Sequence, residues 1–84
     1  MAAVDWYAQR GQRLGVAFMN EVHASIGRAL SLPTAWPLVG HGVRRVLTSR
    51  FPYGVLYAVQ GETLLVLAVM HTRQQPDYWQ DRVE

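Results

Sequence analysis

The side chains best suited to chemistry lie in the second half of the chain. Residues 41–75 contain four arginines and a single carboxylate, that of Glu62. His71 follows an apolar run, and its imidazole could accept or donate a proton near neutral pH. The arginines that could hold a phosphate are Arg45, Arg50 and Arg73. Phosphodiester cleavage needs a proton-transfer group together with such cations, so these residue types allow that reaction.

Two aromatic residues near the C-terminus could add to such a site. Tyr78 could donate a proton or stack on a nucleobase, and Trp79 could provide a second stacking surface. Both side chains could instead pack against the sheet. His71 has a structural alternative too, since a histidine that ends an apolar strand can cap the sheet edge with a hydrogen bond. The residue types alone leave these alternatives open.

The three histidines do not form a metal-binding motif. His23, His41 and His71 fall on a predicted helix, a loop and a strand, with no i, i+4 spacing between them. The chain has no cysteine, so thiolate ligands and disulfides are excluded. Gly40-His41-Gly42 follows no predicted strand, so it is better explained as a loop than as a phosphate-binding turn. We therefore expect neither a metal nor another cofactor.

Length and composition limit the class of protein. The 84 residues predict a single domain, residues 1–84; 50% are apolar and 17% charged, which excludes an intrinsically disordered chain. A net charge of +2 is too small to indicate nucleic-acid binding by itself. The longest uninterrupted apolar run, Leu64–Met70, is far shorter than the ~18 residues of a membrane helix. Since the N-terminal segment carries Asp5 and no apolar core, we expect a soluble, cytoplasmic protein without a membrane partner.

Two helices are predicted in the first third of the chain. Residues 3–10 form the first helix, and Gly11 ends it. Residues 12–30 form the second, because their apolar side chains recur at helical spacing and make one stripe. The stripe consists of Leu14, Ala17, Phe18, Val22, Ile26, Ala29 and Leu30. The helices should form a hairpin with one apolar side, and two prolines make residues 31–42 a loop.

Alternating apolar residues predict three strands after this loop, at residues 43–49, 53–59 and 63–71. Gln60-Gly61 should form the short turn between the last two. Consecutive strands joined by tight loops are antiparallel, and two helices can cover only one face of a sheet. The sequence therefore predicts an α+β fold, with the helical hairpin packed on a small three-stranded antiparallel sheet. A short helical turn at residues 77–80 should follow it.

Both faces of this sheet are predicted to be apolar. Strict alternation places on the first face Tyr53, Val55, Tyr57, Val59, Leu65, Leu67, Val69 and His71. The second face should carry Leu56, Ala58, Leu64, Val66, Ala68 and Met70. Since the helices cover one face only, the other must be covered by the C-terminal turn or by another polypeptide.

The chain from Val43 to Arg82, together with Trp6–Val22 and Leu32–Pro37, resembles the RelE/ParE superfamily. These proteins are the toxins of type II toxin–antitoxin systems and are often labelled plasmid stabilisation proteins. The most specific motifs are Arg50-Phe51-Pro52-Tyr53 followed by Tyr57, and His71-x-Arg73 followed by Pro76, Tyr78, Trp79 and Arg82. The resemblance covers nearly the whole chain, and its strength comes from the order of these motifs.

The resemblance implies two helices on a small antiparallel sheet and a growth-inhibiting cytoplasmic toxin that a cognate antitoxin neutralises. Members of the superfamily usually begin with a further strand, whereas this chain starts with helix-like residues and should lack it. The sheet would then have one more unpaired edge, which invites pairing with another chain. We expect the antitoxin or a second copy of the protein, as a homodimer, to occupy that edge.

Two branches of the superfamily imply different activities. ParE-like members bind and poison DNA gyrase without chemistry of their own, whereas RelE-like members are ribosome-dependent mRNA endoribonucleases. In the nuclease case His71 and Arg73 would be catalytic. In either case the residues expected to contact the target are Arg45, Arg50, Tyr53, Arg73, Tyr78 and Trp79. Gly54 stands where nucleases tend to have a catalytic arginine, and the chain has no lysine, so we favour the ParE-like activity. A nuclease and a degenerate, non-toxic member are the alternatives.

Overall fold

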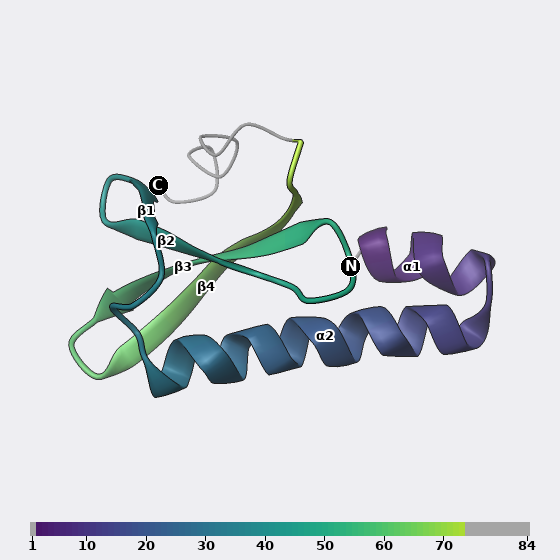
Figure 1. Cartoon of the computed structure of the whole chain (residues 1–84), viewed down its shortest axis with the longest axis horizontal. Coiled ribbons are helices and arrows are strands. Elements are labelled where there is room, and N and C mark those ends of the chain that lie inside the picture. Colours follow the sequence, from purple (N-terminus) through teal and green to yellow (C-terminus); the bar gives the residue numbers. More distant parts are fainter. Residues whose placement is uncertain (1, 74–84) are drawn as a thin grey trace.

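The computed structural model describes residues 2–73, which fold into two helices followed by four strands (Figure 1). The elements are α1 (Ala2–Gln9), α2 (Gln12–Ser31), β1 (Leu38–Gly40), β2 (Val43–Leu47), β3 (Tyr53–Gln60) and β4 (Thr63–His71). This arrangement confirms the predicted α+β class. The turn predicted at residues 77–80, with Tyr78 and Trp79, lies outside the described residues.

The two helices form the predicted hairpin. α2 runs along one side of the sheet, and α1 lies antiparallel to the N-terminal part of α2, next to the end of the sheet (Figure 1). Gly11 joins them with a φ of 154°, a conformation that favours glycine. Gly15 brings the helices close together, because a Cβ atom at this position would lie 2.9 Å from the Cβ of Ala8. Small side chains at this crossing therefore let α1 pack directly on the first turns of α2.

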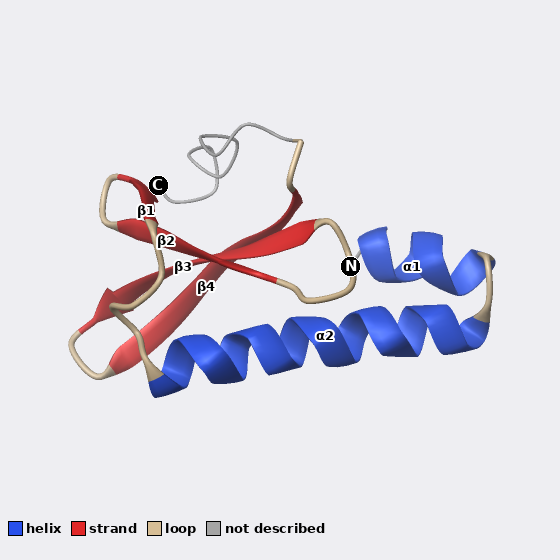
Figure 2. Ribbon diagram, viewed as in Figure 1, coloured by secondary structure: helices blue, strands red, loops and turns tan. Residues whose placement is uncertain are grey.

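The sheet is a meander of four antiparallel strands in the order β1-β2-β3-β4 (Figure 2). The predicted number of three strands is wrong, because β1 lies inside the segment that we expected to be a loop. β1 has only three residues and an irregular register with β2, so it leaves no alternating pattern in the sequence. His41 and the glycines on either side of it all have positive φ, and they turn the chain back into β2.

A β-bulge in β4 changes which of its residues share a face. Leu56 pairs with Ala68 and Tyr57 pairs with Val66, so Leu67 has no residue opposite it. Before the bulge, the register places Leu64 and Val66 on the helix side of the sheet and Leu65 on the other side. The strict alternation predicted the reverse for these positions, because it assumed a regular strand. After the bulge the predicted faces are correct.

The main core lies between the helices and the sheet. Its buried side chains come from α2, β2, β3 and the loop before β3, and they are Phe18, Val22, Ala29, Val46, Phe51, Val55 and Tyr57. The hydroxyl of Tyr57 donates a hydrogen bond to the carbonyl oxygen of Pro33 at 2.7 Å. This bond fixes the chain that leaves α2 against the middle of the sheet.

A second, smaller core lies on the opposite face of the sheet. It consists of the buried side chains Val43, Leu56, Ala68 and Met70, against which Val39 and Leu67 pack. Both faces are therefore apolar, as predicted. On this second face Leu47 and Leu65 remain 49% and 43% exposed. Neither helix within residues 2–73 has the length and hydropathy that crossing a membrane requires.

Candidate functional site

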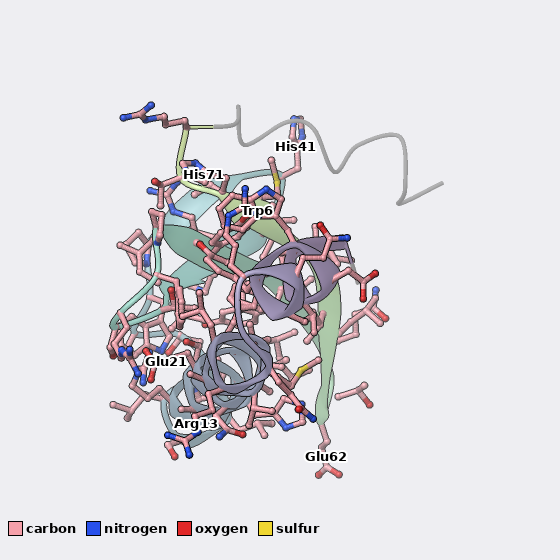
Figure 3. All side chains as sticks on the ribbon, turned by 90° about the vertical axis from the view of Figure 1, so that its right-hand side faces the viewer. Trp6, Arg13, Glu21, His41, Glu62 and His71 are labelled. Carbon is pink, nitrogen blue, oxygen red and sulfur yellow. The ribbon has the colours of Figure 1, made fainter. Side chains whose placement is uncertain are left out.

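The loop between β2 and β3 carries Arg50, and α2 holds this loop in place. One carboxylate oxygen of Glu21, Oε1, accepts hydrogen bonds from the backbone N–H groups of Ser49 and Arg50, each at 2.9 Å. Figure 3 shows Glu21 on the side of α2 that faces the loop. Because two successive backbone groups share one charged acceptor, the backbone from which the Arg50 side chain extends is fixed.

A second pair of α2 residues holds the start of the same loop. Arg28 donates from Nη2 to the carbonyl oxygen of Leu47 at 2.8 Å and to Oγ of Ser25 at 3.0 Å. Ser25 is fully buried, and its hydroxyl lies 2.8 Å from the carbonyl oxygen of Glu21. Positions 21, 25 and 28 lie on one side of a helix, so a single polar stripe on α2 binds the loop.

Hydrogen bonds within the loop make it rigid as well. The buried Thr48 donates from its hydroxyl to the carbonyl oxygens of Phe51 and Tyr53, and its backbone N–H also bonds Tyr53. The backbone N–H of Thr72 donates to the carbonyl oxygen of Pro52 at 2.9 Å, which ties the loop to the residue after β4. Arg50 therefore extends from a closed, internally bonded turn, with its guanidinium carbon 5.5 Å from the centroid of the Phe51 ring.

Tyr53, His71 and Arg73 come together where β3 begins and β4 ends. Tyr53 and His71 are opposite each other in the register, and their ring centroids are 5.2 Å apart in an edge-to-face arrangement. Nδ1 of His71 accepts a hydrogen bond from the backbone N–H of Arg73 at 3.1 Å. An accepting Nδ1 carries no proton, so a neutral His71 has its proton on Nε2. This bond matches the structural alternative, in which His71 caps the strand end.

The Tyr53 phenol is protonated in this setting. Burial raises its pKa above the usual value, and the neighbouring Tyr7 adds to the shift. The Tyr53 ring also contacts Phe18, with centroids 4.9 Å apart, so its position is set by the main core. A protonated phenol in this place can donate a hydrogen bond to an anionic or polar partner, but it is a poor base near neutral pH.

Arg45 lies apart from this group. It pairs with Leu56 on the face of the sheet away from the helices, whereas Tyr53 and His71 belong to the helix side. Arg44 has the opposite orientation and donates from Nη1 to the carbonyl oxygen of Trp36 at 2.7 Å. The two arginines therefore point to opposite faces, as predicted. Of the predicted residues, Tyr53, His71 and Arg73 are together, Arg50 extends from the adjoining loop, and Arg45 is on the other face.

The structure adds two residues that the sequence argument missed. The guanidinium carbon of Arg10 lies 3.4 Å from the centroid of the Trp6 ring, and Nη1 donates to the Trp6 carbonyl oxygen. Trp6 is 48% exposed and contacts Tyr7, which in turn contacts Tyr53. An aromatic chain thus runs from the sheet end to the surface of α1, where Figure 3 labels Trp6. The i, i+4 spacing of tryptophan and arginine in a helix was the available signal.

A hollow of about 390 Å³ lies elsewhere, along one side of α2. The described residues that line it are Gln12, Arg13, Val16, Ala17 and Asn20. None of the predicted site residues is among them. Within residues 2–73, no group of three His, Asp or Glu side chains is arranged to hold a metal ion.

Comparisons of this chain with protein-family models, with curated proteins and with solved structures give no match. The resemblance to the RelE/ParE superfamily therefore stays a prediction from the motifs.

Proposed function

We propose that this protein is the toxin component of a type II toxin–antitoxin module, that it acts in the cytoplasm, and that it inhibits growth by binding DNA gyrase in the manner of ParE-like toxins. The observation that favours target binding over catalysis is the hydrogen bond that His71 accepts. Its Nδ1 accepts the backbone N–H of Arg73, so this nitrogen serves the end of the strand.

The positions of the remaining polar groups support the same choice. A nuclease needs its base, acid and cations around one phosphate. Here Arg45 lies on the opposite face of the sheet from Tyr53 and His71, and Tyr53 has a raised pKa. A binding toxin needs only rigid contact groups, and the fixed loop under Arg50 supplies one of them.

The contact surface of the proposal is the end of the sheet next to α1. Arg50, Tyr53 and Arg73 lie there, and a stacked pair of Trp6 and Arg10 extends it onto α1. Arginine and aromatic side chains are the residue types that carry most of the binding energy in protein interfaces. Leu47, exposed on the second face of the sheet, gives the cognate antitoxin an apolar side chain to cover.

The test compares the two branches directly. The chain is expressed alone and together with the product of the neighbouring gene, and the purified protein is added to a gyrase supercoiling assay and to in vitro translation with transcript mapping. We expect growth inhibition by the chain alone, relief by the neighbouring gene product, and inhibition of supercoiling with intact transcripts. Transcript cleavage with normal supercoiling would support the RelE-like nuclease, for which the contact between the rings of Tyr53 and His71 is the favouring observation. Harmless expression at verified soluble levels would overturn the toxin proposal and leave a degenerate, non-toxic member.

A further inference from the structure

β4 is an edge strand with the dimensions of a pairing surface. It has nine residues, from Thr63 to His71, and it is the last strand in the order of the described sheet. β2 and β3 have neighbours on both sides, and the opposite edge is formed by β1, which has three residues and an irregular register. An edge as short as β1 resists pairing with other chains, whereas a long one supports it.

The side chains of β4 give this edge little protection. Natural edge strands avoid association by means of charged residues, prolines or bulges. Residues 63–70 contain neither a charged residue nor a proline. The bulge at Leu67 leaves the segment before it, residues 63–66, in regular register with β3. This segment also carries exposed apolar side chains on both faces of the sheet, Leu65 at 43% and Val66 at 39%.

We propose that β4 pairs antiparallel with β4 of a second copy of this chain, joining two four-stranded sheets into one continuous sheet. The absence of charged side chains from residues 63–70 favours a second copy of this chain as the partner. An uncharged strand can face itself across a twofold axis without placing like charges opposite each other, and it offers no ion pair to a charged segment of another protein. The chain's net charge of +2 also gives only weak repulsion between copies.

Pairing would cover the exposed apolar surface in one step. Leu65 and Val66 lie on opposite faces, so each would pack against side chains of the second copy on its own face. The N–H and C=O groups of residues 63–66 that point away from β3, and that no other strand of the described sheet pairs, would gain partners at the same time. This inference does not depend on the proposed toxin function, since it concerns the chain alone.

The test is the mass of the purified full chain in sedimentation velocity over a hundredfold range of concentration. We expect a species of twice the 9.5 kDa chain mass at the upper end of the range. Leu65→Lys should weaken this dimer about tenfold or more, because each copy loses a buried leucine and places a charge at the interface. Leu47→Lys is the matched control: it replaces an exposed leucine on the same face, but on β2, which is internal. It should leave the mass unchanged.

Hydrogen exchange tests the same pairing without any substitution. Among residues 63–66, the amides that point away from β3 should exchange more slowly at high concentration than at low concentration. The amides of β2 should stay constant, because β2 has strands on both sides. A monomer at every concentration, or a dimer that Leu47→Lys weakens and Leu65→Lys does not, would overturn the proposal. Growth inhibition is scored separately, so a monomeric toxin would refute the dimer alone and a harmless dimer would refute the toxin alone.

Discussion

The side chain of Arg45 lies against Gly54 on the face of the sheet away from the helices. A Cβ atom at position 54 would come within 2.8 Å of both Cγ and Cδ of Arg45, and Gly54 itself is buried. The stem of the Arg45 side chain therefore occupies the space that a side chain at position 54 would need. The glycine at position 54 lets the Arg45 side chain pack directly on the backbone of β3.

This contact predicts a coupling between the two positions. Gly54→Ala should lower the free energy of unfolding by about 1 kcal/mol or more, because the added methyl overpacks the site. In an Arg45→Ala background the same change should be neutral or stabilising by about 0.5 kcal/mol, since alanine suits a strand interior better than glycine. Urea unfolding of the four proteins measures both effects. Equal costs in the two backgrounds would show that the contact does not limit the site.

The Glu21 carboxylate is predicted to stabilise the β2–β3 loop. Glu21→Ala removes the shared acceptor of the Ser49 and Arg50 N–H groups and should cost about 1–2 kcal/mol. Thermal unfolding followed by circular dichroism measures this cost. Glu62→Ala, in the exposed turn after β3, is the matched loss of a carboxylate and should change stability by less than about 0.5 kcal/mol. Similar values for both variants would contradict the assigned role of Glu21.

The two tyrosines of β3 predict a loss of stability at high pH. Burial raises the pKa of Tyr57, partly offset by the nearby Arg44, and burial together with Tyr7 raises the pKa of Tyr53. A tyrosine whose pKa is higher in the folded state than in the unfolded state favours folding. This contribution is fully present below the pKa in the unfolded state, about 10, and it is lost as the pH rises through the pKa in the folded state. Unfolding free energy measured between pH 8 and about pH 11.5 should therefore fall above about pH 10.

Phenylalanine variants isolate this effect. Tyr57→Phe should reduce the slope above about pH 10, while costing about 1 kcal/mol at neutral pH through the lost bond to the Pro33 carbonyl. An unchanged slope in both Tyr53→Phe and Tyr57→Phe would assign the alkaline transition to other groups.

Arg50 is predicted to be a contact residue of the proposed toxin. Arg50→Ala should reduce target inhibition by about tenfold or more, the usual effect of removing a central arginine from an interface. Arg13→Ala removes another exposed arginine, which lies on α2 outside the proposed contact surface, and should have little effect (Figure 3). Dose–response curves in the supercoiling assay give the comparison. Equal potency of the two variants would exclude Arg50 from the contact surface.

Much of the fold follows from periodic patterns in the sequence. α2 begins at Gln12 as predicted and ends at Ser31, one residue after the predicted end, and β4 has the predicted bounds. Both elements are long enough to repeat their apolar pattern several times. β1 and the bulge at Leu67 were not predicted, since a three-residue strand has no period and alternation presumes a regular strand.

The candidate site was less predictable than the fold. The opposite orientation of Arg44 and Arg45 follows from strand geometry alone and is confirmed. The bond from Ser49 to Glu21 joins positions 28 residues apart, and only the packing of α2 on the loop brings them together. No local sequence pattern predicts this contact, so the fixed backbone position of Arg50 could be found only from the structure.

The unpaired residue at Leu67 sets how β4 tolerates changes of length. Losing Leu67 would place Val66 next to Ala68, opposite the adjacent residues Tyr57 and Leu56 of β3. The register would then be regular, and Leu64, Leu65 and Val66 would keep their present faces. Replacing Leu67 in place keeps the residue count and leaves every other side chain on its present face. At this position of β4, both the loss and the replacement of one residue therefore leave the neighbouring side chains on their faces, so the bulge is a place where the length of the strand can change.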